Sequence, residues 1–235
     1  MEKLINKYPI SLLIVIGLGL YGFNLVDLQV SIMEARNFNV AREMLTENNW
    51  FLTTMNGLPR YEKPPFPAWF TTPFAQLFGL HNVWAYRIPT SIFSILGIVY
   101  FFKLIKIWSS TTIAFYSALI LATSFYYIVI RFEAPSDIYT HVTMLMGLYF
   151  LFKKFPSINW QNVILGGFFL GLSILSKGPV SLYALFLPFI LAYFLSFKIN
   201  FKDHLFKIIS SLVIGLIIGG SWYAYVRIAD PQVFK

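Results

Sequence analysis

The chain is 235 residues long, carries a formal net charge of +8, and is 57% hydrophobic with only 12% charged residues. Soluble domains carry about 25% charged residues, so this composition, with a mean hydropathy of +0.67, excludes an ordinary soluble protein and indicates an integral membrane protein. No cysteine is present, which excludes disulfides and cysteine-ligated metals. The absence of a P-loop, a Rossmann glycine fingerprint, a nucleophile elbow and an HExxH motif argues against soluble-type NTPase, dehydrogenase, hydrolase and zincin chemistry.

Seven stretches are apolar enough to cross a bilayer, because a span needs about 20 mostly apolar residues. The first has a basic start, a long apolar core and no cleavage site, so we interpret it as a retained signal anchor. The sequence thus predicts one all-α integral membrane domain over residues 1–235, with a large outer loop over 27–82. The expected spans are about 8–26, 84–103, 110–130, 136–152, 160–176, 179–197 and 207–226.

The fifth predicted span, 160–176, is short and rich in glycine, with Gly166, Gly167 and Gly171. Small residues let helices approach closely inside a membrane. We therefore expect this helix to pack tightly against neighbouring helices rather than to face lipid.

Lysines indicate the orientation of the chain, because cytoplasmic loops collect positive charge. The N-terminus and alternate loops hold nine lysines against Glu2 and Asp203, a net of +7. We expect this side to be the cytoplasm of a multi-pass plasma (inner) membrane protein, with the first large loop on the outer, periplasmic side. Most of the net charge of +8 then reflects the membrane topology of the chain, and no nucleic-acid partner is expected. The nine are Lys3, Lys7, Lys103, Lys106, Lys153, Lys154, Lys198, Lys202 and Lys207.

All six arginines fall on the outer side or at outer span ends. The guanidinium fork matches phosphate and carboxylate oxygens, so their gathering suggests an anionic ligand. For any single arginine, snorkelling or pairing with a local carboxylate is an equal alternative. The six are Arg36, Arg42, Arg60, Arg87, Arg131 and Arg227.

The outer loop is expected to contain two helices that lie at the membrane interface. Residues 32–47 lack proline and glycine and carry apolar residues at helical spacing, which predicts an amphipathic helix. Asn48 and Asn49 end it, and Asn56-Gly57 marks a turn. A proline-rich segment then enters a second helix over about residues 68–78, closed by Gly79.

Carboxylates and cations of the outer loop are the first candidates for chemistry. Glu34, close to the end of the first span, is suited to act as a general base or to bind a cation, or else it forms a charge ladder with Arg42. Glu62 and Lys63 precede two prolines, so their backbone is rigid and their side chains point to opposite sides. A metal for Glu62 and a phosphate for Lys63 would satisfy them, as would solvation at the surface.

Two further groups lie at the outer ends of spans. Arg131, Glu133 and Asp137 cluster between the third and fourth spans and are candidates for function, although capping of a helix by Asp137 is an alternative. Lys177 lies in a Gly-Pro break where the fifth span ends. There it is expected to meet a lipid phosphate, or simply to snorkel.

Two motifs carry a resemblance to a known family: E-A-R-x-x-x-x-A-R-E-M at residues 34–44 and N-G-x-x-R-Y-E-K-P-P at residues 56–65. Together with Arg87-Ile88-Pro89, Ser176-Lys177-Gly178 and Trp222-Tyr223, they resemble the aminoarabinose-transferase and protein O-mannosyltransferase superfamily of membrane glycosyltransferases, which share the GT-C architecture. The resemblance implies that a sugar is moved from a polyprenyl-phosphate carrier to an acceptor at the outer face. It also implies outer-loop carboxylates and often a divalent metal cation.

The resemblance places Glu62 near the metal and Lys63 and Lys177 on the carrier phosphate. It places Arg36 beside the carboxylates of the first loop. Arg131 is expected to bind the carrier phosphate together with Arg36, Lys63 and Lys177. Four further residues are expected to support the site. The supporting residues are Arg42, Arg60, Tyr61 and Glu133.

The resemblance departs at one position that matters for catalysis. Members of the family usually have Asp-Glu at the start of the loop helix, where this chain has Met33-Glu34. Glu34 is therefore the expected base, with Asp137 or Glu133 as alternatives.

The expected partners are a polyprenyl-phosphate-linked sugar, membrane lipids and an outer-face acceptor of unknown kind. Two other functions stay open. One is a non-catalytic subunit that binds or transports a polyprenyl lipid. The other is an inactive truncated fragment of such an enzyme, since family members are usually much longer.

Overall fold

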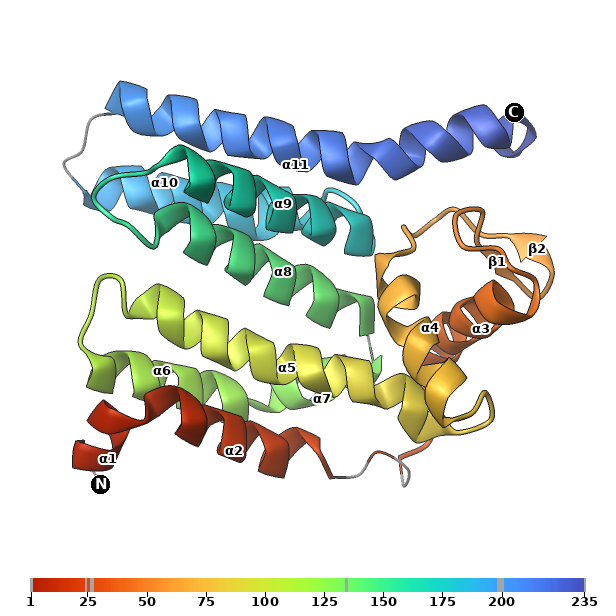
Figure 1. Cartoon of the computed structure of the whole chain (residues 1–235), viewed down its shortest axis with the longest axis horizontal. Helices are drawn as coiled ribbons and strands as arrows, with labels where there is room; N and C mark the ends of the chain where they lie inside the picture. The colour runs from red at the N-terminus through yellow and green to blue at the C-terminus, as the bar shows by residue number, and fades with distance from the viewer. Residues whose placement is uncertain (1, 24, 26–27, 134, 198–200, 235) are drawn as a thin grey trace.

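A computed structural model of the protein describes residues 2–23, 25, 28–133, 135–197 and 201–234. Long helices lie side by side and form a bundle, and a smaller group made of α3, α4 and a hairpin covers one end of it (Figure 1). We call that end the loop end. The elements are α1 (Glu2–Lys7), α2 (Pro9–Tyr21), α3 (Ile32–Thr46), β1 (Thr54–Met55), β2 (Leu58–Pro59), α4 (Phe66–Phe78), α5 (Val83–Ile105), α6 (Thr111–Thr123), α7 (Phe125–Glu133), α8 (Pro135–Phe152), α9 (Trp160–Lys177), a π-helical turn (Leu182–Phe186), α10 (Leu187–Ser196), α11 (Phe201–Ala229) and a 3-10 turn (Pro231–Phe234).

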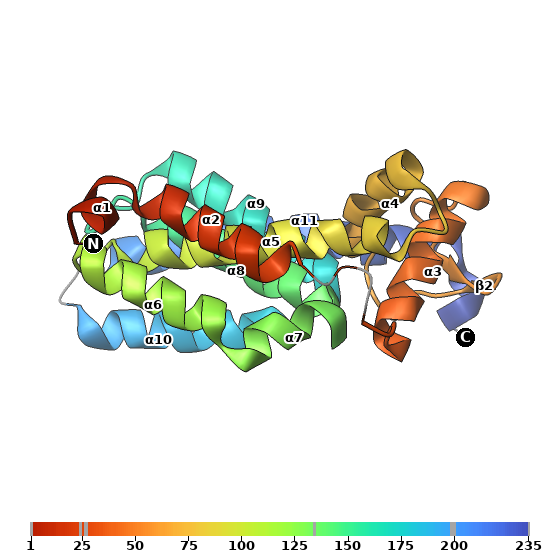
Figure 2. The same ribbon diagram turned by 90° about the horizontal axis from the view of Figure 1, so that it is seen from below.

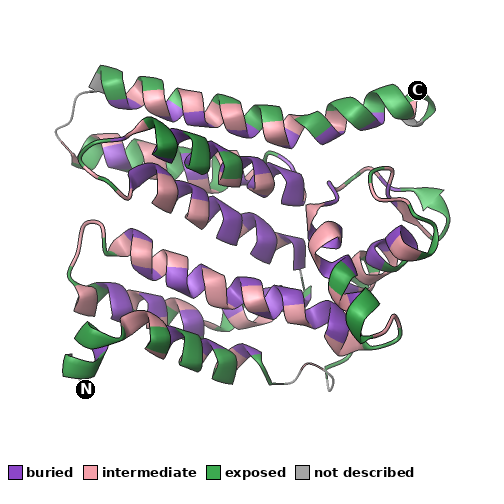
Figure 3. Ribbon diagram, in the orientation of Figure 1, coloured by how far each residue is buried: buried purple, intermediate pink, exposed green. Residues whose placement is uncertain are grey.

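Helix α8 lies in the middle of the bundle and packs against α5 on one side and α9 on the other. Helix α11 packs on α9, and α2 and α6 pack on α5. Burial falls from the middle outwards, so that α8 is mostly buried and α11 is largely exposed (Figure 3). The exposed faces carry apolar side chains such as Val15, Ile120 and Ile217, each more than 60% exposed. Apolar faces of this extent suit lipid and not water, which confirms the predicted all-α integral membrane fold.

Every predicted span falls on helix, but the helices differ in length. By length and composition, α5 and α11 are long and apolar enough to cross a membrane, and α6 with α7 adds a third if the bent pair is one span. The first window, 8–26, runs beyond α2 to positions 24 and 26, which lie outside the described residues, as do residue 27 of the loop and Lys198. That all seven segments cross the membrane stays a prediction.

The predicted span over 110–130 is wrong as a single helix. Helices α6 and α7 meet at an angle of 50°, because Ser124 takes an extended conformation (φ −67°, ψ 132°) between them. The hydroxyls of Thr123 and Ser124 donate to carbonyls of the preceding turn at 2.9 Å. Such side-chain bonds compete with the helical ladder and favour a bend.

The glycines of the predicted fifth span do pack closely. A β-carbon at Gly171 would lie 2.6 Å from the Ile218 β-carbon, and one at Gly167 would lie 2.7 Å from the Ser211 carbonyl oxygen. Helices α9 and α11 therefore approach to a distance that only glycine allows.

The two helices predicted between the first and second spans form, over Ile32–Thr46 and Phe66–Phe78. Their place at the outer membrane interface stays a prediction. The hydroxyl of Ser31 accepts from the Glu34 amide and caps the first of them.

Between these helices, Asn56 and Gly57 have positive φ (55° and 73°) and form a two-residue turn. The turn joins the short antiparallel strands β1 and β2. The buried carboxylate of Glu43, on α3, accepts from the amides of Asn56 at 2.6 Å and Gly57 at 3.3 Å. The hairpin is therefore anchored to α3.

Candidate functional site

Four cationic side chains gather at the loop end, and we call them the cationic cluster. Arg36 comes from α3, Arg60 and Lys63 come from the segment that follows the hairpin, and Lys177 comes from the last turn of α9. Asp137, in the first turn of α8, lies among them. Burial lowers the pKa of Lys63 from its ordinary 10.5, and the charges of Arg60, Lys177 and Arg36 lower it further, while Asp137 opposes them. Positive charge thus exceeds negative charge around Lys63.

Lys177 forms an ion pair with Asp137. The two side chains are 32% and 14% exposed, so the pair is open on the lysine side. Lys177 is the last residue of α9, which ends at Gly178, whose φ of 83° favours glycine. The carboxylate of Asp137 lies at the N-terminus of α8, where the helix dipole favours negative charge.

Arg60 forms the buried base of the cluster and is 7% exposed. Its Nη1 donates to the Arg36 carbonyl at 3.2 Å, and its own carbonyl accepts from the Thr53 hydroxyl at 2.6 Å. Its Nε has no hydrogen-bond partner among the described residues. Burial lowers the pKa of Arg60, against the charge of Glu62. A cavity of about 20 Å³ adjoins Arg60 and Lys63, large enough for about one water molecule.

The two residues before Lys63, Tyr61 and Glu62, do not line this cavity. Glu62 is exposed, whereas Lys63 is half-buried and lines the cavity, so the two side chains lie in different surroundings. The Tyr61 hydroxyl donates to Asp230 at 2.9 Å and ties the segment to the end of α11. Burial and this hydrogen bond raise the pKa of Tyr61 to about 12. The contacts of Arg60 and Tyr61 therefore hold the segment that leads to Lys63.

Glu34 does not lie with the cationic cluster, although the sequence suggested a place beside Arg36. Its two carboxylate oxygens accept from Nε and Nη2 of Arg87 at 2.7 and 2.8 Å, and both side chains are 1% exposed. Arg87 also donates to the carbonyls of Leu25 and Leu28. Glu34 is thus not on a solvated charge ladder. Its role as a base stays a prediction, and this geometry favours a structural role instead.

Arg131 also lies apart from the cluster and is 2% exposed. Its Nη1 donates to the Tyr21 carbonyl at 2.6 Å and to the Ser91 hydroxyl at 2.9 Å, and its guanidinium lies 4.1 Å from the centre of the Phe132 ring. These contacts join α7 to the end of α2 and to α5. Arg131 is therefore enclosed in this structure, and its role in binding the carrier phosphate stays a prediction. Glu133, two residues later, is exposed.

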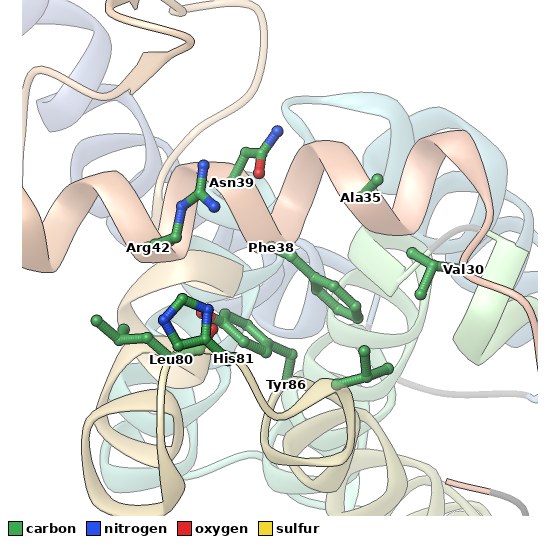
Figure 4. A pocket seen from close by; sticks show the side chains of 9 residues that line it. Val30, Ala35, Phe38, Asn39, Arg42, Leu80, His81 and Tyr86 are labelled. Atoms are coloured by element: carbon green, nitrogen blue, oxygen red, sulfur yellow. The ribbon is translucent and has the colours of Figure 1, made fainter. Parts of the chain in front are cut away.

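Arg42 belongs to a different pocket, of about 240 Å³, between α3 and the start of α5. Figure 4 shows Arg42 on α3 opposite His81, with Phe38 directed towards Tyr86. The rings of Phe38 and Tyr86 are 4.7 Å apart. This pocket shares no lining residue with the cavity at Arg60 and Lys63.

The described residues do not assemble a metal site from their own side chains. They contain no group of three or more His, Asp or Glu residues placed to hold a metal ion. Glu62 offers one exposed carboxylate, so a cation there would need water or substrate oxygens as its further ligands. The metal at Glu62 stays a prediction.

Sequence reasoning did not identify the partners of two residues that shape this end of the molecule. Arg87 holds Glu34, and Glu43 holds the hairpin. The signal for Arg87 was present, because an arginine inside a span needs a partner. Four glutamates of the loop and Glu133 were equally available partners on the sequence alone.

Two curated relatives share part of this sequence. The undecaprenyl phosphate-alpha-4-amino-4-deoxy-L-arabinose arabinosyl transferase of Wigglesworthia glossinidia brevipalpis is 27% identical, over 83% of this chain and 36% of the relative. The protein of the same name from Pseudomonas savastanoi pv. phaseolicola is 33% identical, over 44% of this chain and 18% of the relative. The chain therefore spans little more than a third of the length of the first relative.

Two crystal structures of ArnT from Cupriavidus metallidurans share the fold. The apo structure has a TM-score of 0.81 and the structure bound to undecaprenyl phosphate has one of 0.79. Each is 22% identical, and the match covers 94% of this chain and 42% of ArnT. The model of the family described as dolichyl-phosphate-mannose-protein mannosyltransferase matches residues 62–223. Because this match covers more than half of the sequence, the chain belongs to the dolichyl-phosphate-mannose-protein mannosyltransferase family.

Proposed function

We propose that this protein is a membrane glycosyltransferase that uses a sugar linked to polyprenyl phosphate and transfers it to an acceptor at the outer face of the plasma membrane. The observation that carries the proposal is the cationic cluster, in which the four cations Arg36, Arg60, Lys63 and Lys177 outnumber the nearby carboxylates of Asp137 and Glu62. An excess of cations at the level where helices leave the membrane suits the phosphate of a membrane-bound carrier.

The comparisons support this choice of ligand. The curated relatives are named for transfer from an undecaprenyl phosphate sugar, and ArnT, which shares the fold, has been crystallised with undecaprenyl phosphate. In this chain, Lys63 and Lys177 would bind the phosphate through their ammonium groups. Arg36, at the exposed edge of the cluster, would add a guanidinium.

The reaction that fits this arrangement is displacement at the anomeric carbon of the sugar. The acceptor oxygen forms a bond to that carbon, the bond from the carbon to the phosphate oxygen breaks, and its electron pair leaves on the phosphate. Fixed cations stabilise the charge that develops on the leaving phosphate. Lys63 is suited to this task because it is half-buried and because positive charge exceeds negative charge around it.

We assign the base to Asp137 in place of Glu34. A hydroxyl acceptor loses a proton as it attacks, and a carboxylate within reach can take it, whereas a phosphate acceptor would need no base. Asp137 lies in the cluster, and binding of the carrier phosphate by Lys177 would loosen the ion pair and release the carboxylate. Glu34, by contrast, is enclosed with both oxygens bonded to Arg87.

Binding is tested with the purified full chain in nanodiscs, titrated with undecaprenyl phosphate. Removing one partner of a desolvated charge pair costs about 2–5 kcal/mol, so we expect Lys63→Gln or Lys177→Gln to weaken binding by about 30-fold or more. Lys154→Gln, an exposed lysine at the other end, serves as the control and should bind as the wild type does. Equal binding by all four proteins would remove the cluster from the proposal.

Transfer is tested with a radiolabelled polyprenyl-phosphate sugar and candidate acceptors. Asp137→Asn should still bind undecaprenyl phosphate, because it removes only negative charge from the cluster, but it should not transfer to a hydroxyl acceptor. Equal transfer by Asp137→Asn and the wild type would exclude Asp137 as the base. Met33, where the family usually has aspartate, favours the alternative of lipid binding without transfer. Binding without transfer to any acceptor would support that alternative.

A further inference from the structure

A second cationic site lies at the end of the bundle opposite the loop end, which we call the lysine-rich end. A pocket of about 340 Å³ opens there, with lysines from two helices at its wall. Lys103 and Lys106 come from the end of α5, and Lys153 follows the end of α8. The rest of the wall is apolar or aromatic, with Ile10 from α2 and Tyr149 from α8 among its residues. We call this the basic pocket.

None of the three lysines is neutralised by a carboxylate among the described residues. The pocket has no aspartate or glutamate in its lining. Ion pairs among the described residues, such as Glu34 with Arg87, Asp137 with Lys177 and Asp203 with Lys207, involve none of the three lysines. The basic pocket, which is open to the surface, therefore has a positive charge that no carboxylate in its lining compensates, and this charge attracts an anion.

Aromatic rings hold the ammonium groups in place without cancelling their charge. Lys103 Nζ lies 4.6 Å from the centre of the Tyr100 ring and 5.7 Å from that of Tyr149. Lys153 Nζ lies 4.7 Å from the Phe150 ring centre, and Lys106 has a similar contact with Phe102. Cation–π contacts of this kind restrict a lysine that would otherwise be flexible. The pocket is thus organised before a ligand arrives.

Membrane topology alone does not require that three lysines line one pocket. Positive charge that retains a loop in the cytoplasm acts wherever the lysine stands in the loop, as exposed Lys154 illustrates. Lys153, its neighbour, is half-buried and lines the pocket. The convergence of lysines from α5 and α8 on one pocket is an additional feature that calls for a ligand.

We propose that the basic pocket binds the headgroup of an anionic phospholipid. The lysines match the phosphate oxygens, and the apolar wall made by Ile10, Phe102 and Ile107 fits the start of the acyl chains better than it fits a free phosphate. Basic pockets between membrane helices on the cytoplasmic side bind lipid headgroups by the same physics. The site is independent of the cationic cluster, which lies at the other end of the bundle (Figure 2).

The test uses the full chain in detergent micelles, titrated with phosphatidylglycerol or phosphatidylcholine and followed by native mass spectrometry. Each lysine beside an anionic lipid is worth about five-fold in affinity, so replacing three costs on the order of 100-fold. We expect this loss for the triple variant Lys103→Gln/Lys106→Gln/Lys153→Gln. We also expect the wild type to bind phosphatidylglycerol at least about ten-fold more tightly than phosphatidylcholine, which requires the contribution of about two lysines.

Controls separate the site from general charge and from misfolding. Lys153→Gln should weaken phosphatidylglycerol binding, while adjacent Lys154→Gln should not, and a triple lysine-to-arginine variant should retain binding. Equal losses for Lys153→Gln and Lys154→Gln, or equal binding of the two lipids by the wild type, would overturn the proposal. So would competition by glycerol phosphate as strong as that of the lipid, because the ligand would then be a soluble phosphate.

Discussion

The buried pair of Glu34 and Arg87 sets the position of the first outer helix. Glu34 is in the first turn of α3, and Arg87 is in the first turns of α5 and also holds the chain that leads from α2. Two charges that are each 1% exposed cost desolvation, which their mutual hydrogen bonds offset. The pair therefore joins three segments at the loop end of the bundle.

We predict that Glu34→Gln destabilises the protein by about 3–5 kcal/mol, because it leaves the Arg87 guanidinium buried without its counter-charge. Thermal unfolding in detergent, followed by circular dichroism, measures the change. A base would behave differently, since its amide variant would lose transfer activity and keep its stability. Unchanged stability with lost transfer would therefore restore Glu34 as the catalytic base.

Two comparisons complete this test. Glu34→Leu combined with Arg87→Met removes both charges, and it should recover most of the lost stability, because an apolar pair of similar volume avoids the desolvation cost. Glu133→Gln, an exposed carboxylate, should change the free energy of unfolding by less than about 0.5 kcal/mol.

The candidate site was only partly predictable at the level of residues. The sequence pointed to Lys63, Lys177 and Arg36, and the structure brings them to one place, although their role in binding phosphate stays a prediction. It also pointed to Arg131 and Glu34, which the structure encloses elsewhere. Spacing along a chain places a charge at a span end, but it does not determine which neighbouring helix supplies the partner.

A pH dependence follows from the environment of Lys63. Burial and neighbouring cations lower its pKa below 10.5, so the lysine loses its proton at a lower pH than an ordinary lysine. A bound phosphate prefers the protonated lysine. Its affinity should therefore fall as pH rises through this lowered pKa, by up to about ten-fold per pH unit.

Titrations of undecaprenyl phosphate between about pH 8 and 10.5 measure this effect, since the phosphate itself, with a second pKa near 6, is already fully ionised there. Lys63→Arg is the matched variant because a guanidinium stays protonated over this range. It should give a flatter profile than the wild type. Parallel declines in the two proteins would assign the effect to another group.

Elements were easier to predict than their contacts. Apolar windows predicted where helices form, and the proline-rich entry and Gly79 predicted the bounds of α4 closely. The bend between α6 and α7 was missed, because a serine in an apolar run marks a bend only when its hydroxyl bonds back to the helix. The strands β1 and β2 were missed because each has two residues and depends on Glu43.

Two adjacent glycines of α11 give a sharp test of the contact between α9 and α11. A β-carbon at Gly219 would lie 2.5 Å from the Ile174 β-carbon, whereas one at Gly220 would meet nothing within 4 Å. We predict that Gly219→Ala destabilises the protein by about 1–3 kcal/mol, because it forces the helices apart. Gly220→Ala should stabilise it by up to about 1 kcal/mol through better helix propensity.

The melting temperatures of both variants in the same detergent provide the measurement. Both variants replace glycine by alanine in α11, so the effects of helix propensity and of the detergent cancel when the two melting temperatures are compared. Similar melting temperatures for the two variants would show that α9 and α11 are not in close contact at this point.

At the level of the whole molecule, the two ends of the bundle carry positive charge for different purposes. Arginine and lysine at the loop end gather around Asp137, whereas the opposite end carries lysine and the basic pocket. This division is consistent with a chain that keeps its lysine-rich end in the cytoplasm and places a phosphate site outside. Orientation therefore determines from which side each site is reached.

The orientation can be measured directly, because the chain has no cysteine and any introduced thiol is the only one. Leu58, on the hairpin, is 69% exposed, and Glu133 and Ser157 are exposed at opposite ends of α8. In intact cells, Leu58→Cys and Glu133→Cys should react with a membrane-impermeant maleimide. Ser157→Cys should react only after the membrane is permeabilised.

Each outcome tests a different part of the arrangement. Labelling of Leu58→Cys and Glu133→Cys from the same side requires an even number of membrane crossings between them. Since α5 is long and apolar enough to be one crossing, the bent pair of α6 and α7 is then the second. Labelling of Ser157→Cys from the opposite side makes α8 a span, although it is less apolar than α5. Reaction of Ser157→Cys in intact cells, with Leu58→Cys protected, would reverse the orientation and move the cationic cluster to the cytoplasmic face. A polyprenyl-phosphate sugar would then have to be used from the inner leaflet, and the proposed outer-face transfer would be wrong.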